Sequence, residues 1–214
     1  MRQGSVGIAP EGYPFIVLSA FTAVVFALIG CWPVAVIFTG VTWFSGHFFR
    51  DPERVVPTAP GLAVSPADGK VIKVEPMPDP FTGETRMCVC IFMNVFSVHV
   101  NRSPVAGVIK AIAYHPGKYL NAALDKASTD NERCAYAIES GEHSFSVVQV
   151  AGLIARRIVC RVAEGEEVGR GERFGLIRFG SRVDVYLPET YGANVRVGDI
   201  VYAGQSLLAQ SRES

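Results

Sequence analysis

The sequence predicts a mainly β domain with few helices, preceded by an N-terminal hydrophobic helical hairpin. Three observations support this prediction. Residues 12–49 contain no Asp, Glu, Lys or Arg. Beyond residue 50, apolar residues occur in short runs rich in Val and Ile that Gly and Pro interrupt, as in β-strands. Near the C-terminus, a glycine followed by an acidic residue recurs in a pattern typical of tight turns. We therefore expect two domains, at residues 1–49 and 50–214.

The uncharged N-terminal segment is too long for one membrane-spanning helix and matches two. One helix over this segment would be roughly 55 Å long, whereas the hydrocarbon core of a bilayer is about 30 Å thick. Residues 30–33, Gly-Cys-Trp-Pro, lie at the midpoint and favour a break there. The sequence thus predicts helices over residues 13–29 and 34–49. The alternatives are a re-entrant or interfacial hairpin, a helix pair buried in a soluble core, and a signal peptide.

A helical hairpin brings both of its ends to the same side of a membrane, and basic residues lie at both ends. Arg2 precedes it, and Arg50 and Arg54 follow it. Positive residues at the ends of membrane helices usually lie on the cytoplasmic side. We therefore expect the chain to reside at the cytoplasmic membrane, with the larger domain facing the cytoplasm.

Short apolar runs divide the larger domain. The expected strands cover residues 70–74, 87–92, 105–114, 135–138, 145–150, 154–162 and 183–187, and the one expected helix covers residues 119–131. In the second half, Val168-x-x-Gly171-Glu172 resembles Val195-x-x-Gly198-Asp199. Such paired turns are similar to those in the hammerhead sandwiches of biotinyl and lipoyl carrier domains. This similarity predicts a barrel-sandwich-hybrid-like architecture.

Composition limits the partners and cofactors. The 20 Lys and Arg residues balance the 20 Asp and Glu residues, so no overall charge favours nucleic acid as a partner. The five cysteines form none of the C-x-x-C pairs that zinc sites use, and we expect no metal. Cys88 and Cys90 are spaced so that both thiols lie on one face of a strand. We interpret all five cysteines as reduced and structural.

A Gly-Ser pair, Gly180-Ser181, stands between two strand-like runs, where a simple turn would more often use Asn-Gly or Asp-Gly. The Ser181 hydroxyl could attack the Gly180 carbonyl in an N-to-O acyl shift. Elimination from the resulting ester leaves dehydroalanine, and hydrolysis then leaves a pyruvoyl group and ammonia. Glycine at the attacked position tolerates strain and lets the hydroxyl approach. Such a reaction needs a base and a carboxylate that orients the base.

Two other segments could supply these groups. Asp68 lies in a predicted turn, Ser65-Pro-Ala-Asp-Gly-Lys70, and His99 lies in an apolar, strand-like stretch at residues 94–104. Taken singly, Asp68 is more simply a turn residue and His99 a core histidine. Taken with Ser181, they are the candidate orienting carboxylate and base.

Four ordered motifs resemble those of the short, archaeal-type phosphatidylserine decarboxylase proenzymes. They are Phe48-Phe-Arg-Asp-Pro-Glu-Arg54, Ser65-Pro-Ala-Asp-Gly-Lys-Val71, Val98-His-Val-Asn-Arg-Ser-Pro104 and Arg178-Phe-Gly-Ser-Arg-Val-Asp184. The resemblance covers nearly the whole chain. It implies that Asp68, His99 and Ser181 form a self-cleaving triad. It also implies a β chain of residues 1–180 and an α chain of residues 181–214.

The resemblance further implies a cofactor, a substrate and a partner. The cofactor is a covalent pyruvoyl group derived from Ser181, which forms a Schiff base with the amine of phosphatidylserine; carbon dioxide leaves and phosphatidylethanolamine is released. The two chains would stay together as an α/β heterodimer, and a higher oligomer is an open alternative. For the lipid phosphate, we nominate Arg50, Arg54 and Arg102 as the binding cations.

The proton donor for the decarboxylation step stays open between two histidines. Longer relatives carry two histidines in the histidine motif, whereas this chain has His99 alone there. His115 is the second candidate, and a structural role for it is an equal alternative.

Three other functions compete with this one. A membrane-anchored biotinyl or lipoyl carrier domain would keep an intact chain and carry a modified Lys126. A pyruvoyl decarboxylase of a soluble amino acid would not need the uncharged segment at residues 12–49. A serine hydrolase is disfavoured because no G-x-S-x-G motif occurs.

Overall fold

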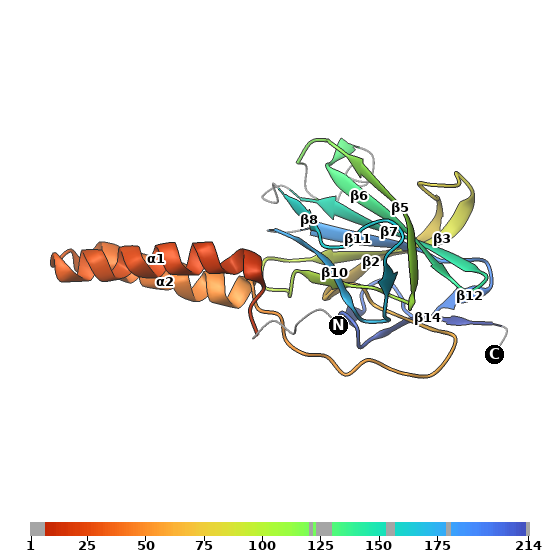
Figure 1. The fold of residues 1–214 in the computed structure, drawn as a ribbon, viewed down its shortest axis with the longest axis horizontal. Coiled ribbons are helices and arrows are strands. Elements are labelled where there is room, and N and C mark those ends of the chain that lie inside the picture. The colour runs from red at the N-terminus through yellow and green to blue at the C-terminus, as the bar shows by residue number, and fades with distance from the viewer. Residues whose placement is uncertain (1–6, 120–121, 123–129, 153–156, 179–180, 213–214) are drawn as a thin grey trace. The chain divides into compact units, whose positions relative to one another are not determined.

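The computed structural model describes residues 7–119, 122, 130–152, 157–178 and 181–212. The chain divides into two compact units, residues 1–53 and 54–214. Within the described residues, the first unit contains the α-helices and the second contains the strands (Figure 1). The predicted helix over residues 119–131 lies almost wholly outside the described residues. Lys126, Gly180 and the first three residues of the strand expected over residues 154–162 also lie outside them.

The first unit is an antiparallel pair of helices, α1 (Tyr13–Leu28) and α2 (Trp32–Phe48), which confirms the predicted hairpin (Figure 1). Gly30 separates them with a φ of 80°, a left-handed conformation that glycine adopts without a steric cost. A hydrogen bond of 2.9 Å from the Thr42 hydroxyl to the Ser19 hydroxyl joins the helices. Small and hydroxylated residues at the contact allow the two backbones to approach closely.

The outward surface of the hairpin is apolar. Leu18, Leu28 and Trp43 are 68%, 80% and 69% exposed within the chain. A soluble core would bury such residues, so the alternative of a helix pair inside a soluble core is disfavoured. A short 3-10 turn (Pro10–Gly12) precedes α1. Together they form the segment Pro10–Leu28, which is long and apolar enough to cross a membrane.

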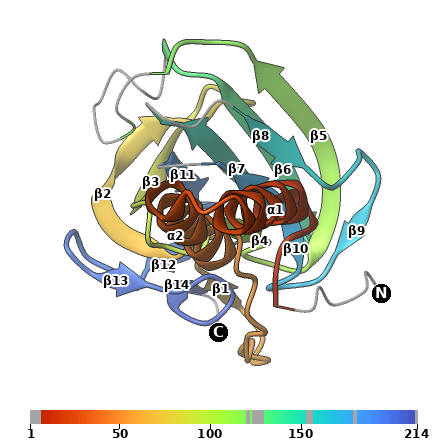
Figure 2. The ribbon, with the colours of Figure 1, turned by 90° about the vertical axis from the view of Figure 1, so that its left-hand side faces the viewer.

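The second unit is built from three sheets, which confirms the mainly β prediction. Its strands are β1 (Leu62–Val64), β2 (Gly69–Pro78), β3 (Thr85–Met93), β4 (Val100–Arg102), β5 (Gly107–His115), β6 (Arg133–Ser140), β7 (His143–Ala151), β8 (Ile158–Cys160), β9 (Glu167–Val168), β10 (Arg173–Ile177), β11 (Ser181–Tyr186), β12 (Tyr191–Ala193), β13 (Ile200–Val201) and β14 (Leu207–Ser211). The large sheet has the order β13-β2-β3-β11-β7-β6-β5-β9, and the small ones have the orders β1-β14-β12 and β4-β10-β8. Figure 2 shows that the large sheet is curled, with β2 and β5 on opposite sides.

The large sheet has two buried faces with different residues. Its inner face carries the main core, which includes Val183 and Val185 of β11. Its outer face carries a smaller cluster that includes Cys88, Cys90 and Tyr186. Because successive strand residues point to opposite faces, Ser181 shares the inner face with Val183, and Arg182 lies on the outer face.

The repeated glycine-acid pattern forms two equivalent turns. Backbone N–H groups three residues before each acidic residue donate to its carboxylate, from Gly169 to Glu172 at 2.7 Å and from Arg196 to Asp199 at 2.8 Å. The first turn leads into β10 and the second into β13. The sequence repeat is therefore a structural repeat, as predicted.

The two buried thiols of β3 give a testable prediction about reactivity. Cys88 and Cys90 are fully buried, with their sulfur atoms 3.8 Å apart, and burial raises the pKa of the Cys88 thiol. A raised pKa keeps the thiol protonated and unreactive at neutral pH. We expect a maleimide to label the exposed Cys160 in the native protein, and Cys88 and Cys90 only after unfolding. Equal labelling rates for all three in the native protein would contradict this burial.

Candidate active site

Ser181 is the first residue of β11, in the centre of the large sheet. It lies opposite Met93 of β3 on one side and opposite Ala151 of β7 on the other. Its side chain is fully buried, and its hydroxyl oxygen has no hydrogen-bond partner among the residues that the structure describes. A buried hydroxyl with no partner is costly in an ordinary core and is typical of a functional position.

His99 is fully buried and comes directly before β4. Its Nδ1 lies 2.9 Å from the carbonyl oxygen of Ser97. A carbonyl can only accept a hydrogen bond, so we infer that Nδ1 carries the proton of the neutral ring. Nε2 then carries the lone pair, which is the state that a general base requires.

Asn101 links the segments that carry the three predicted residues. Its side-chain amide donates to the carbonyl of Pro66 at 3.4 Å, in the turn that holds Asp68, and lies 3.6 Å from the sulfur of Met93, the strand partner of Ser181. His99 lies two residues before Asn101 in the same segment, and its backbone carbonyl accepts a hydrogen bond from the Ile177 N–H at 3.3 Å. The described geometry thus brings the three motifs to one region of the fold.

A buried hydrogen-bond chain holds Asn101 in place. The Gln149 amide donates to the Asn101 side-chain oxygen at 2.8 Å, and the Tyr136 hydroxyl donates to the Gln149 side-chain oxygen at 2.7 Å. Asn101, Gln149 and Tyr136 are each fully buried. Fully satisfied buried networks of this kind fix the positions of their members. Sequence reasoning missed all three, although Asn101 lies inside the histidine motif.

The Asp68 carboxylate has partners on both oxygens. Oδ2 accepts from the Arg54 guanidinium at 2.8 Å, and Oδ1 accepts from the backbone N–H of Ala203 at 2.7 Å. The second Arg54 nitrogen donates to Gln205 at 2.8 Å, and the guanidinium lies 5.8 Å from the centre of the Tyr202 ring. Arg54 therefore connects Asp68 to the turn between β13 and β14.

The other nominated residues lie in different settings. Arg102 is 5% exposed and donates to the Gly171 carbonyl at 2.9 Å, and Arg50 donates to the His47 carbonyl at 2.7 Å within the first unit. His115 is exposed at the end of β5, three strands from β11. Three strand spacings amount to about 14 Å, and the alternation places His115 on the outer face, opposite to that of Ser181.

Comparison with known proteins decides the family. Residues 41–209 match the family model described as phosphatidylserine decarboxylase. The chain is 66% identical to the phosphatidylserine decarboxylase proenzyme of Oleidesulfovibrio alaskensis, over 100% of this chain and 98% of that one. It is 65% identical to the proenzyme of Nitratidesulfovibrio vulgaris, over 98% and 97%, and 47% identical to that of Burkholderia mallei, over 96% of each. The chain belongs to the phosphatidylserine decarboxylase family.

This phosphatidylserine decarboxylase family member has a buried ion pair directly behind Ser181. On the outer face of β11, the Arg182 guanidinium contacts both carboxylate oxygens of Asp184, at 2.7 and 2.8 Å. Arg182 also donates to the Ala122 carbonyl at 3.2 Å. Removing either partner would leave an unpaired charge in the interior, so we expect the start of β11 to depend on this pair for its stability.

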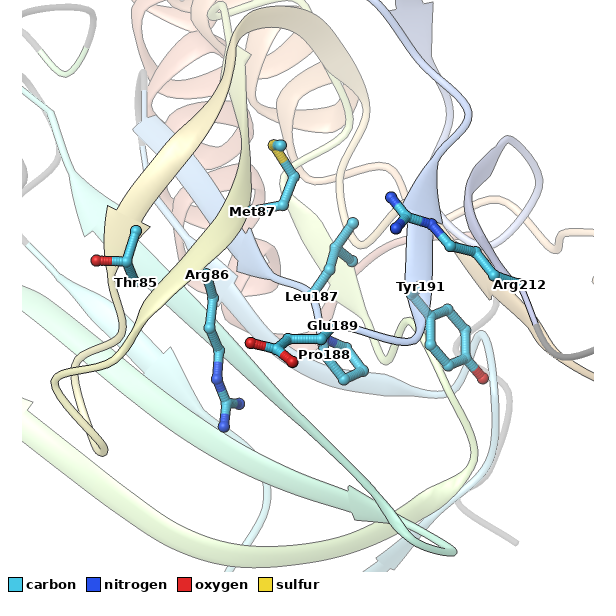
Figure 3. Close-up of a pocket in the computed structure, with 8 residues that line it drawn as sticks. All are labelled: Thr85, Arg86, Met87, Leu187, Pro188, Glu189, Tyr191 and Arg212. Carbon is cyan, nitrogen blue, oxygen red and sulfur yellow. The ribbon is translucent and has the colours of Figure 1, made fainter.

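A pocket of about 410 Å³ in this family member lies away from Ser181, at the other end of β11 (Figure 3). It is lined by Thr85, Arg86, Met87, Leu187, Pro188, Glu189, Tyr191 and Arg212. The five residue steps from Ser181 to Tyr186 cover roughly 17 Å. None of the predicted site residues lines this pocket, so we do not assign the reaction to it.

Proposed function

We propose that the chain is a phosphatidylserine decarboxylase that cleaves itself between Gly180 and Ser181, and that the pyruvoyl group derived from Ser181 is its cofactor. The observation that supports this most strongly is the fully buried Ser181 hydroxyl with no partner among the described residues, in a motif of the decarboxylase family. The two proenzymes named first carry a name that denotes a precursor.

The residues around Ser181 are compatible with such a group. Its strand neighbours on the inner face, Met93 and Ala151, are fully buried and carry no charge. A pyruvoyl group would supply a ketone that condenses with a substrate amine and accepts the electron pair left on the substrate when carbon dioxide leaves. An uncharged wall favours loss of a carboxylate as neutral carbon dioxide.

His99 is the proposed base of self-cleavage. Its Nε2 lone pair takes the proton of the Ser181 hydroxyl as the oxygen attacks the Gly180 carbonyl, and the hydrogen bond from Nδ1 to the Ser97 carbonyl holds the ring. Asp68 completes the proposed triad. Its hydrogen bonds to Arg54 and Ala203 hold its carboxylate in a fixed position, as an orienting group needs.

The substrate's position and the quaternary structure are part of the same proposal. Phosphatidylserine lies in the membrane, and the apolar outer surface of the hairpin supports anchoring there, with the second unit in the cytoplasm. Arg50 remains the proposed cation for the lipid phosphate. Arg54 is already paired with the Asp68 carboxylate and Arg102 is buried, so they are weaker candidates. The cleaved chains would remain an α/β heterodimer because β11 pairs with β3 and β7.

Deleting residues 1–49 tests the role of the hairpin. Burial of apolar surface contributes about 25 cal/mol per Å² to membrane binding, and the deletion removes that surface. The shortened chain should therefore bind vesicles weakly, and its activity on phosphatidylserine vesicles should fall by roughly tenfold or more. Activity on a short-chain, water-soluble phosphatidylserine should largely persist, because Asp68, His99 and Ser181 all lie in the second unit. Equal vesicle activity of full-length and shortened chains would show that the hairpin does not bring the enzyme to its lipid.

The reaction itself is tested on the full-length protein in mixed micelles with phosphatidylserine. We expect stoichiometric release of carbon dioxide and formation of phosphatidylethanolamine. A protein that is cleaved but forms neither product from phosphatidylserine, and instead decarboxylates a free amino acid, would favour the soluble-substrate alternative.

A further inference from the structure

A buried glutamate, Glu132, lies in register with Ser181 across the large sheet. Ser181 is opposite Ala151, and the Ala151 backbone N–H donates to the Glu132 carbonyl at 2.9 Å. In the pairing of β6 with β7, Arg133 is opposite Val150, so Glu132 is opposite Ala151. Ser181 and Glu132 are therefore two strand spacings apart, which is roughly 10 Å between their Cα atoms.

The two side chains also share a face. Cys134 and Tyr136, two and four residues after Glu132, both belong to the inner core, and so does Ala151. Alternation along the strand then places Glu132 on the inner face with Ser181. Since Ala151 is small, the space between the glutamate and the serine is lined by a methyl group and not by a large side chain.

Glu132 is held firmly in this position. It is 6% exposed, and the Tyr119 hydroxyl donates to its Oε2 at 2.6 Å. Its backbone N–H donates to the Lys118 carbonyl at 3.0 Å, and the neighbouring Asn131 amide donates to the Ala151 carbonyl at 2.7 Å. The Asn131 contact and the hydrogen bond from Ala151 to the Glu132 carbonyl fix this segment against β7, the strand next to Ser181.

A second phenol lies beside the same carboxyl group. Tyr114 of β5 pairs with Cys134 of β6, two residues after Glu132. The self-cleavage proposed above uses His99 and Asp68 and gives no role to Glu132 or to these phenols.

We propose that Glu132 is the proton donor of the decarboxylation step and that Tyr119 positions it. This inference rests on the proposed function. A buried acid on the same face as Ser181 can reach a substrate attached there, whereas His115 lies on the opposite face.

The step balances with one proton. When the bond to the carboxylate breaks, its electron pair stays with the substrate and carbon dioxide leaves. The O–H bond of Glu132 at Oε1 then breaks, and its proton forms a C–H bond at the carbon that lost carbon dioxide. Tyr119 stabilises the carboxylate that remains through its hydrogen bond to Oε2. A proton from water restores the acid, which accounts for the one proton consumed per carbon dioxide released.

The test uses the full-length protein with Glu132→Gln, and with Glu139→Gln as the control, since Glu139 is exposed on β6, the strand that begins directly after Glu132. Glu132→Gln should split its chain normally and, with phosphatidylserine and borohydride, should still trap the lipid on residues 181–214. The wild type should also trap the adduct that has lost carbon dioxide, whereas the adduct of Glu132→Gln should keep the substrate carboxylate. Its formation of phosphatidylethanolamine should fall by roughly 10²- to 10⁴-fold. Glu139→Gln should match the wild type in all three measurements.

An isotope measurement separates proton donation from a structural role. In deuterium oxide, the wild type should place one deuterium on the product carbon in a single configuration. Glu132→Gln should give both configurations, because water then supplies the proton without a fixed direction. A single configuration from Glu132→Gln, a rate within about threefold of the wild type, or an uncut but folded chain would each overturn the proposal.

A second variant keeps the test decisive if Glu132→Gln does not fold. Tyr119→Phe removes one hydroxyl and keeps the ring, so it should split normally and form product roughly tenfold more slowly. An unchanged rate would overturn the proposal. If the wild type itself forms no phosphatidylethanolamine, the proposed function fails and this inference fails with it. If the wild type is active and Glu132→Gln is equally active, only this inference fails.

Discussion

Ser181→Ala leaves the chain uncut and abolishes decarboxylation, and this is the largest effect that we expect of any single substitution. The change removes the one oxygen that can attack the Gly180 carbonyl and from which the pyruvoyl group is derived. It should cost little stability, because the hydroxyl has no hydrogen-bond partner among the described residues. A denaturing gel and an assay of phosphatidylethanolamine formation measure both effects.

Ser144→Ala is the matched control for this substitution. Ser144 is an exposed serine on β7, near the opposite end of the strand from Ala151. This variant should split and react as the wild type does. If Ser181→Ala splits at the wild-type rate, Ser181 is not the nucleophile and the proposed function is wrong.

His99→Ala should block cleavage almost completely, which is the second large effect. It removes the base that takes the Ser181 proton, and general-base catalysis of this kind contributes roughly 10²- to 10⁴-fold. Incubation of the purified precursor over days, followed by a denaturing gel, would measure the residual rate. Asp68→Asn should slow cleavage to a smaller extent, because it keeps an acceptor for Ala203 but loses the charge that faces Arg54.

His115→Ala is the comparison that discriminates between the two histidines. The exposed position of His115 on the outer face predicts normal cleavage and normal decarboxylation. Loss of either reaction in His115→Ala would restore His115 as a functional residue. Wild-type cleavage of His99→Ala would remove His99 from the triad.

Local sequence patterns predicted the elements of the fold but not their arrangement. The hairpin followed from the absence of charge over residues 12–49, and every strand of six or more residues followed from short runs of Val and Ile. The order of the large sheet, with β11 between β3 and β7, depends on pairing between segments far apart in the chain. No local pattern contains that information.

Only those residues of the candidate site that lie in recognisable sequence motifs could be predicted. Asp68, His99 and Ser181 are small parts of otherwise ordinary turns and strands, and their motifs singled them out. Charge alone was a poor guide, because the sequence does not show that Arg54 is paired with Asp68 or that Arg102 is buried. The network of Asn101, Gln149 and Tyr136 was missed because its members lie far apart in the chain.

The role of Glu132 could not be predicted from the sequence either. The triplet Asn131-Glu132-Arg133 could cap a helix or support a site, and the sequence alone does not distinguish these roles. Only the pairing of β6, β7 and β11 reveals that Glu132 and Ser181 lie on one row and one face of the sheet.

The central claim is that the chain cleaves itself at Ser181, and the intact mass of the purified full-length protein tests it most directly. The account predicts two polypeptides, residues 1–180 and residues 181–214, with the second lighter by one ammonia than the same residues with a free serine terminus. That loss identifies a pyruvoyl group in place of the serine. A single uncut chain, or a second polypeptide that retains its terminal amine, would contradict the account.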